Sequence, residues 1–409
     1  MHTLEVLHQS PVTPLDPAAL PASRPEGLYV HIPFCFHKCH YCDFYSITRQ
    51  TPERMHRFVD RLLAEADLWA RRVPLVAGPI RTVFFGGGTP SLLPLEPMRQ
   101  LIAGLRDRLN LSAVEEWTVE CNPATVSLEY SRMLREAGVD RLSFGAQSFN
   151  RAELAVLERH HDPDDVPRSI EIARAAGFSR LNLDLIYAIP GQTHSDWSAN
   201  LERALSLYLT HLSCYGLTFE SNTPIAVKQR LGLMHAAEES LELQMMHHTR
   251  QRLTAAGLPP YEISNYAAPG QECQHNLVYW TGGNYIALGP SASSHVEGHR
   301  WKNRPHLGEW EAAVDANEFP AVDYEILSPA RRAGELAMLL LRLSGGLRYD
   351  AFAARTGLDA RAVYASTVDN LRSIGLIEVD DCAIRLSAKG LNVADAVAGE
   401  FLLSDNAIA

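Results

Sequence analysis

Six short apolar runs, each followed by an amphipathic stretch, limit what this chain of 409 residues can fold into. The amphipathic stretches have the spacing of helices. In the first, residues 51–69, Thr51 is placed to cap the helix and Pro52 lies in its first turn. Strands that alternate with helices form a parallel sheet, so we expect an α/β fold whose sheet curls into a full or partial TIM-type barrel. The expected strands are residues 28–33, 82–85, 116–120, 141–144, 181–186 and 212–217.

Changes in composition divide the rest of the chain. Residues 1–27 are rich in Pro, Ala and Ser, which predicts a flexible tail before the barrel of residues 28–260. In residues 261–322 the apolar segments are shorter than in the barrel and are rich in aromatic residues and Gly. This pattern suggests a β-rich extension over one barrel edge. Residues 323–409 have the pattern of three helices and two short strands, a winged-helix-like module. Its 12 acidic and 9 basic residues suit packing or a protein partner better than DNA.

The charge of the chain narrows the class of partner. There are 48 acidic and 37 basic residues, a net charge of −11, which argues against a nucleic-acid backbone as the main partner. The sequence has no apolar run of eighteen residues and no basic start followed by an apolar stretch, so we expect neither a membrane span nor a secretory signal. These features predict a cytoplasmic protein.

Three of the seven cysteines, Cys35, Cys39 and Cys42, form a CxxxCxxC motif directly after the first expected strand. An odd count with one tight cluster does not suit a disulfide framework and indicates a metal or metal-sulfur centre. Three thiolates on one loop can bind three irons of a cubane 4Fe-4S cluster and leave one iron open. The alternative is a zinc site with His37 or His40 as the fourth ligand.

Unusual residues follow the other expected strands at their carboxyl ends. A Gly-rich segment, residues 86–90, follows the second strand, Glu120 and Asn122 end the third, Gln147 follows the fourth, and Asp184 lies in the fifth. In a parallel barrel these ends share one face, which carries the site. Each feature alone has a simpler explanation, such as a tight turn, a surface acid or a helix cap. Together they predict one site beside the cysteine loop.

These motifs resemble those of the radical S-adenosylmethionine (SAM) superfamily, and within it the HemN/HemW branch. The resemblance rests on CxxxCxxC followed by Asp43 and Phe44, and on the segments at residues 29–33, 86–90, 120–123, 141–149 and 182–187. It implies a partial (β/α)6 barrel, a 4Fe-4S cluster on the three cysteines, and SAM on the open iron. In that superfamily the reduced cluster cleaves SAM to methionine and a 5'-deoxyadenosyl radical.

The resemblance also implies positions for ligand-binding residues, and none of these residues is expected to be catalytic. Backbone amides of a Gly run can approach a polar ligand closely, carboxylates suit ribose hydroxyls and an ammonium, and Arg suits a carboxylate. For Arg159 the alternative is an ordinary surface ion pair. The residues expected near SAM are Tyr29, Gly87 and Glu120, and those expected near SAM or a second nucleotide-sized ligand are Tyr41, Gly88, Thr89, Gln147, Arg159 and Asp184.

Two functions within the branch compete. One is haem carriage, with haem or porphyrin as ligand and haem-accepting proteins as partners. The other is the oxygen-independent coproporphyrinogen III dehydrogenase reaction of porphyrin biosynthesis. The dehydrogenases carry a further cysteine two positions after the third cluster cysteine and a longer N-terminal extension, whereas this chain has Asp43 and Phe44 and only a short tail. The branch also implies an electron donor such as flavodoxin or ferredoxin, and a homodimer is an option that the sequence leaves open.

Residues 275–280 match the HNxxYW motif of the HemW group and favour haem carriage. A neutral imidazole can ligate haem iron and aromatic rings can lie against a porphyrin, which makes His275 a candidate haem contact. The alternative is that His275 is a hydrogen-bonded core residue and that Tyr279 and Trp280 pack a β-rich edge. Cys273 is a further candidate ligand, although a buried cysteine is commoner.

Overall fold

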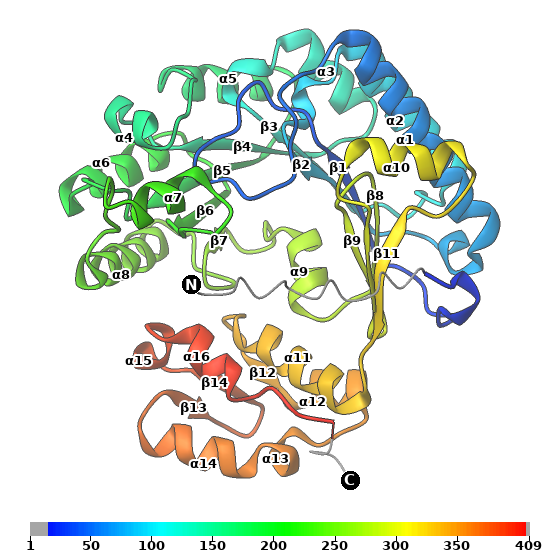
Figure 1. Ribbon diagram of the computed structural model, residues 1–409. Coiled ribbons are helices and arrows are strands. Elements are labelled where there is room, and N and C mark those ends of the chain that lie inside the picture. The colour runs from blue at the N-terminus through cyan, green and yellow to red at the C-terminus, as the bar shows by residue number, and fades with distance from the viewer. Residues whose placement is uncertain (1–14, 406–409) are drawn as a thin grey trace, which may run out of the picture.

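The computed structural model describes residues 15–405, without the side chains of residues 74 and 75, and its centre is one curved sheet (Figure 1). Six neighbouring strands of this sheet run parallel and follow one another in sequence order, which confirms the expected alternation. The six are β1 (Gly27–Ile32), β2 (Thr82–Gly87), β3 (Glu116–Cys121), β4 (Arg141–Gln147), β5 (Arg180–Tyr187) and β6 (His211–Gly216).

Five more strands extend the sheet at both ends. At one end β7 pairs antiparallel with β6. At the other end β8 pairs parallel with β1, and three antiparallel strands follow it. The two outermost strands, β7 and β11, do not pair with each other, so the barrel is partial and open. These strands are β7 (Asn265–Ala267), β8 (Tyr285–Leu288), β9 (Ser293–Val296), β10 (His299–Asn303) and β11 (Ala321–Ile326).

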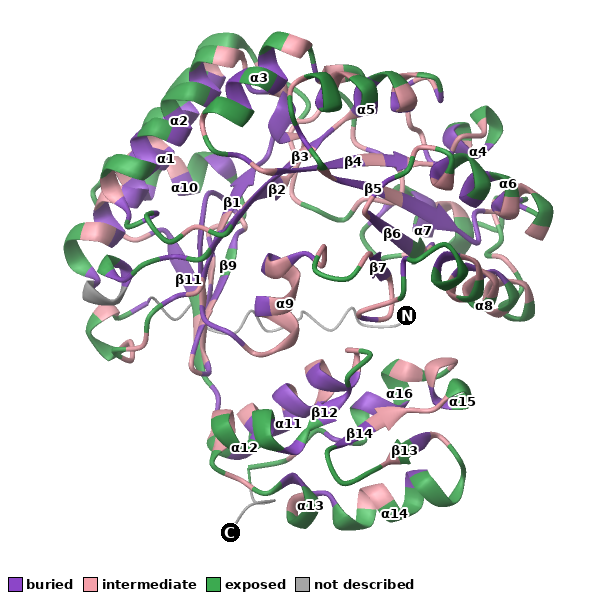
Figure 2. Ribbon diagram, turned by 180° about the vertical axis from the view of Figure 1, so that it is seen from behind, coloured by how far each residue is buried: buried purple, intermediate pink, exposed green. Residues whose placement is uncertain are grey.

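Helices cover the convex face of the sheet and bury their apolar sides against it (Figure 2). In the first of them Thr51 accepts a hydrogen bond from the Arg54 amide at 3.3 Å, as its capping position predicts. The same helix places Phe58, Leu62 and Trp69 in the core, each fully buried. The helices are α1 (Pro52–Arg72), α2 (Leu95–Arg108), α3 (Leu128–Glu136), α4 (Arg151–Val156), α5 (Asp165–Ala175), α6 (His194–Leu205), α8 (Glu239–Ala255) and, in the extension, α10 (Leu307–Asp315). A further helix, α7 (Pro224–Arg230), lies beside the loop that follows β1, where the Ile225 amide donates to the His40 carbonyl at 3.0 Å.

The N-terminal segment differs from the expected flexible tail. Residues 1–14 lie outside the described residues. Residues 15–26 lie against the barrel, because Leu15 is part of the main core and the Glu26 amide donates to the Asn284 carbonyl at 2.7 Å. The Pro-rich composition did not reveal these contacts, since they involve residues far along the chain.

The C-terminal module has its own core and a small three-stranded sheet in the order β12, β14, β13. The three expected helices and the β ribbon are present, with α13 and α14 as two parts of one expected helix. Strand β11 crosses the expected boundary at residue 323, so the module's core begins with α11. No helix among the described residues has the length and apolarity of a membrane span. The module contains α11 (Pro329–Leu341), β12 (Leu347–Arg348), α12 (Tyr349–Thr356), α13 (Ala360–Val363), α14 (Ala365–Ser373), β13 (Ile377–Val379), β14 (Ala383–Leu386), α15 (Ala388–Leu391) and α16 (Ala394–Gly399).

The HNxxYW motif lies on a helix, α9 (Gln274–Trp280), and not in the β structure expected for this region. This helix lies in the concavity of the sheet, between the barrel and the C-terminal module (Figure 1). Its first turn is held by Glu116 at the start of β3, whose carboxylate accepts from the His275 amide at 3.1 Å and the Cys273 thiol at 3.3 Å. A carboxylate at a helix N-terminus satisfies amides that have no partner within the helix.

Candidate cofactor site

A cavity of about 710 Å³ runs through the interior of the partial barrel. At one end it is lined by the loop that follows β1 and by residues at the carboxyl ends of β2 to β6. At the other end it is lined by Arg141 and His211, which begin β4 and β6, and by Asn276 of α9. The parallel register of the strands therefore brings the expected site residues to one mouth and leaves α9 to close the opposite end.

The cysteine motif forms the wall at the mouth of this cavity. We call residues 33–47, which contain all three motif cysteines, the cluster loop. Its two ends are joined by a hydrogen bond from the Ile47 amide to the Pro33 carbonyl at 2.8 Å. Cys35, Cys39 and Cys42 all line the cavity and are free thiols. The loop therefore presents three sulfur ligands to one space.

Neighbouring donors face the cluster-loop sulfurs. The Cys35 sulfur lies 3.7 Å from the Thr89 hydroxyl, and Arg159 Nη1 donates to the Cys39 sulfur at 3.6 Å. Burial raises the pKa of Cys42 to about 11 and raises the pKa of Cys35. Without iron the Cys35 and Cys42 thiols are therefore neutral, whereas iron would replace their protons. Three thiols and two hydrogen-bond donors to sulfur fit a 4Fe-4S cluster.

The glycines at the end of β2 and directly after it allow the cluster loop to lie against the strand ends. A Cβ at Gly88 would meet the Phe34 carbonyl oxygen at 2.7 Å, and one at Gly86 would meet the Glu120 carboxylate at 3.0 Å. Gly87 has a φ of +103°, a conformation that side chains disfavour. Larger residues would therefore separate the loop from the strands or push Glu120 out of place.

Two buried carboxyl groups face the middle of the cavity. Burial, with a contribution from the charge of Asp184, raises the pKa of Glu120 to about 8. Burial also raises the pKa of Asp184, although Ser143 and Asn182 donate to it at 3.1 and 2.8 Å. Neither acid has an ion-pair partner within 4.0 Å among residues 15–405. A cationic or hydroxyl-bearing ligand would remove this electrostatic cost, and SAM has both kinds of group.

Arg159 and Gln147 lie beside the acids. Arg159 donates to the Gly145 carbonyl as well as to Cys39, so it is not the surface ion pair that its sequence context also allowed. Its Nε is buried without a partner. Gln147 has a φ of +66°, rare for a residue with a side chain, and the β4–β5 pairing shifts register between Gly145 and Gln147. Such strain is typical of functional sites.

The cavity contains eleven of the thirteen expected site residues, and Tyr29 and His275 are the two exceptions. The Tyr29 hydroxyl lies 3.2 Å from His31 Nδ1, and the Tyr29 ring stacks on Phe84, which itself lines the cavity. The eleven are Cys35, Cys39, Tyr41, Cys42, Gly87, Gly88, Thr89, Glu120, Gln147, Arg159 and Asp184.

The structure favours the alternative that His275 is a hydrogen-bonded core residue over a contact with haem. Its side chain is buried, Nδ1 lies 2.9 Å from the Thr82 hydroxyl, and Nε2 lies 2.8 Å from the Tyr279 hydroxyl. The ring also stacks on Phe84. Burial lowers the pKa of His275 to about 3, so the ring is neutral. Both nitrogens are hydrogen-bonded, and the side chain does not line the cavity. Cys273, the second candidate, is likewise buried and bonded to Glu116.

A polar layer deeper in the cavity was missed by the sequence reasoning. It consists of short side chains that alternate along β3 to β6 and face inward, and Asn182 links several of them by donating to Ser143 and Ser213 at 2.8 and 3.1 Å. The signal in the sequence was a polar residue at every second position of otherwise apolar strands. The members that line the cavity are Thr118, Ser143, Asn182 and Ser213.

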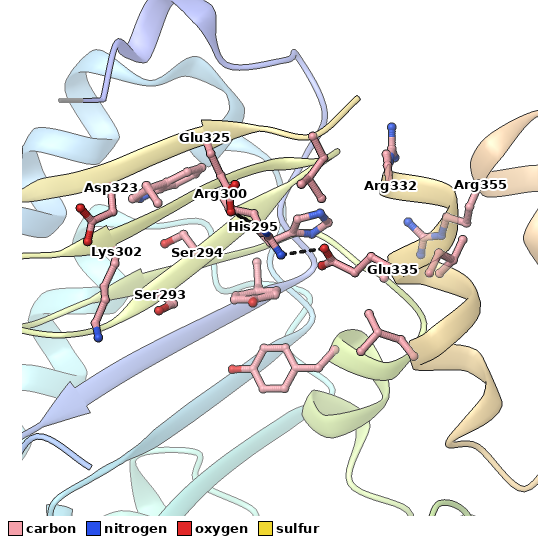
Figure 3. A pocket seen from close by; sticks show the side chains of 17 residues that line it. Ser293, Ser294, His295, Arg300, Lys302, Asp323, Glu325, Arg332, Glu335 and Arg355 are labelled. Carbon is pink, nitrogen blue, oxygen red and sulfur yellow. Dashed lines mark hydrogen bonds and ion pairs between the residues drawn. The ribbon is translucent and has the colours of Figure 1, made fainter. Parts of the chain in front are cut away.

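A second cavity, of about 400 Å³, lies between the extension strands and the C-terminal module (Figure 3). Arg300 crosses it and pairs with Glu325 and with Glu335, whose Oε2 lies 2.6 Å from Nη1. His295 faces it with both ring nitrogens engaged, by the Gly283 carbonyl at 3.1 Å and the Gly298 amide at 3.0 Å. This cavity therefore has ion pairs but no free imidazole.

Comparisons with known proteins agree with this arrangement. A model of the radical SAM superfamily matches residues 29–204, and a model of the HemN C-terminal domain matches residues 327–393. Similar proteins include Heme chaperone HemW of Lactococcus lactis, 32% identical over 93% of this chain and 98% of the relative. Heme chaperone HemW of Mycobacterium tuberculosis is 34% identical over 96% of this chain and 98% of the relative.

Among solved structures, coproporphyrinogen III oxidase (HemN) from Escherichia coli aligns with a TM-score of 0.81 over 94% of this chain and 92% of that chain. At 23% identity this likeness shows the fold, including the attached C-terminal domain. The extent and identity of the HemW matches, together with the cysteine loop and the partial barrel, show that the chain belongs to the HemW family of radical SAM proteins.

Proposed function

We propose that this protein binds a 4Fe-4S cluster, SAM and haem, and that it delivers haem to acceptor proteins. The observation that carries the proposal is the cluster loop, which brings three free thiols to the mouth of a polar cavity. A fourth thiol is missing from the loop, so a cubane there would keep one iron open for SAM. The seven unpaired cysteines also suit a reducing compartment, and we propose that the protein works in the cytoplasm.

The residues around the cavity have separate tasks in this proposal. When bound, the cluster supplies single-electron reduction. Thr89 and Arg159 donate to the cysteine sulfurs and thereby favour their thiolate form. Glu120 and Asp184 accept hydrogen bonds from the ammonium and hydroxyl groups of SAM, and Arg159 is close enough to the same space to orient its carboxylate.

Haem carriage is the second half of the proposal. It is supported by full-length similarity to relatives that are named Heme chaperone HemW. The partners that we propose are haem-accepting proteins and an electron donor such as flavodoxin or ferredoxin. A homodimer is compatible with cluster binding and with haem carriage. Sedimentation of the cluster-loaded protein measures the oligomeric state.

Titration of the cluster-loaded protein with haem tests the proposal. We expect one haem per chain, visible as a protein-dependent Soret band, and transfer of that haem to an apo-acceptor such as apomyoglobin. Bovine serum albumin loaded with haem is the control for passive exchange. No saturable binding, or transfer no faster than from albumin, would contradict haem carriage.

The competing function is the coproporphyrinogen III dehydrogenase reaction, favoured by the fold shared with HemN. That likeness concerns the fold alone, and in the cluster loop Asp43 and Phe44 stand where the dehydrogenases have their additional cysteine. We expect no conversion of coproporphyrinogen III to protoporphyrinogen IX in an anaerobic assay with SAM and a reductant. Measured turnover would replace haem carriage by the dehydrogenase reaction.

A further inference from the structure

We propose that haem docks at the mouth of the large cavity, where the exposed imidazoles of His37 and His160 offer its iron an axial ligand. This proposal rests on the haem carriage proposed above and names the residues at which haem binds. His37 belongs to the cluster loop, and His160 belongs to the segment between α4 and α5. Both residues line the cavity and both are exposed.

The two imidazoles form one group with a carboxylate. Their ring centroids lie 4.5 Å apart in an edge-to-face arrangement, and His37 Nε2 lies 3.7 Å from Glu158 Oε2. One potential ligand atom from each of His37, Glu158 and His160 lies within 4.8 Å of the others. A carboxylate beside an imidazole is the usual neighbour of a metal-ligating histidine, because it orients the ring. The rings are too close for a porphyrin to lie between them, so one imidazole would ligate the iron from one side.

Other histidines near the cavity have no free nitrogen at its mouth. His275 and His211 are bonded through both ring nitrogens. His161 follows His160 directly, but both of its ring nitrogens are buried. His40 does not line the cavity, and its Nδ1 lies 3.0 Å from the Lys228 amine. Along the described part of the cavity wall, His37 and His160 are therefore the imidazoles that a large ligand could reach from outside.

The surroundings of this pair suit a porphyrin. Phe36 and Phe44 of the cluster loop line the same cavity with 73% and 62% of their surface exposed. Exposed aromatic rings of this size are costly in water and provide an apolar face for a flat macrocycle. Lys38 lines the cavity and Lys228 lies beside His40, and neither forms an ion pair with a carboxylate among residues 15–405. Two unpaired amines can bind the two propionates of haem.

The test compares four cluster-loaded proteins titrated with haem: the wild type, the His37→Ala/His160→Ala double variant, His160→Ala and His247→Ala. His247 is the matched control, because it is an exposed histidine on α8 that does not line the cavity. We expect the double variant to bind haem at least about tenfold more weakly. We also expect it to lose the histidine-ligated optical and EPR signature, while His247→Ala resembles the wild type. Free imidazole should restore that signature in the double variant.

The iron-sulfur absorbance of each variant shows whether its cluster is intact. It therefore distinguishes a lost haem ligand from a damaged cluster loop. If the double variant loses its cluster, its haem spectrum and affinity are compared with those of the cluster-free wild type, and His160→Ala, which is not on the cluster loop, shows whether His160 is the ligand. Wild-type affinity and an unchanged haem spectrum in the double variant would overturn the docking site while leaving haem carriage intact. A wild-type protein that binds no haem would overturn both.

Discussion

Replacement of Glu120 by Gln should change the stability of the cluster-free protein in a way that depends on pH. Burial and the charge of Asp184 raise the pKa of Glu120 from an ordinary value of 4.5 to about 8. Below pH 4.5 Glu120 is neutral in the folded and in the unfolded protein, and its burial costs no charge. As pH rises through about 8 the folded protein must hold a buried charge, so stability is lost. Glutamine has nearly the same shape and no charge to lose.

The pKa difference sets the size of this effect. About 1.4 kcal/mol for each pKa unit gives an upper limit of about 5 kcal/mol between low and high pH. Glu120 borders a cavity that admits water, which screens the charge, so we expect about 3 kcal/mol. At pH 5 the two proteins should be nearly equal in stability. At pH 9 the glutamine variant should be the more stable by this amount.

Urea unfolding followed by circular dichroism at pH 5 and pH 9 measures the effect, with Glu115→Gln as the control. Glu115 is an exposed neighbour whose burial is negligible and whose ion pair with Arg81 lies at the surface. An equal difference between wild type and Glu120→Gln at both pH values would refute the reasoning. So would a wild type that is the more stable at pH 9.

Three further sets of substitutions probe the cluster and the helix that closes the cavity. Alanine at any one of the three cluster-loop cysteines should abolish the iron-sulfur absorbance, whereas alanine at the exposed Cys382 should leave it unchanged; an intact cluster in a loop variant would exclude that ligand. Glu116→Gln should lower the free energy of unfolding by about 3–5 kcal/mol in urea titrations, because two guanidinium groups lose their buried partner; a loss below about 1 kcal/mol would contradict the ion-pair account. His275→Ala should cost about 2–4 kcal/mol of stability, because it leaves two hydroxyls without a partner, and should not change haem affinity in the titration; weaker haem binding at unchanged stability would return this residue to the haem site.

The mouth of the cavity was predictable because its residues follow from strand order. Glu120 and Gln147 lie at the carboxyl ends of two neighbouring parallel strands and Asp184 lies within the third, opposite Gly145, and the carboxyl ends of parallel strands share one face. The three cysteines lie within eight residues, so their spacing alone predicts that their sulfurs share one loop. These features need only the positions of strands and motifs within the sequence.

The closed end of the cavity depends on contacts that the sequence does not display. The aromatic HNxxYW segment becomes a helix because Glu116, more than 150 residues earlier, binds its first turn. His275 is then drawn between Thr82 and Tyr279, so a residue that looked like a haem ligand becomes part of the core. Leu15 is a second example, because it packs into the main core although the Pro-rich composition around it predicts no such contact.

The most direct test of the account is the metal content of protein prepared without oxygen. The account predicts about four iron and four sulfide ions per chain, and a Mössbauer signal in which one iron alone changes when SAM is added. Zinc without sulfide, or a cluster in which SAM changes no iron, would contradict it.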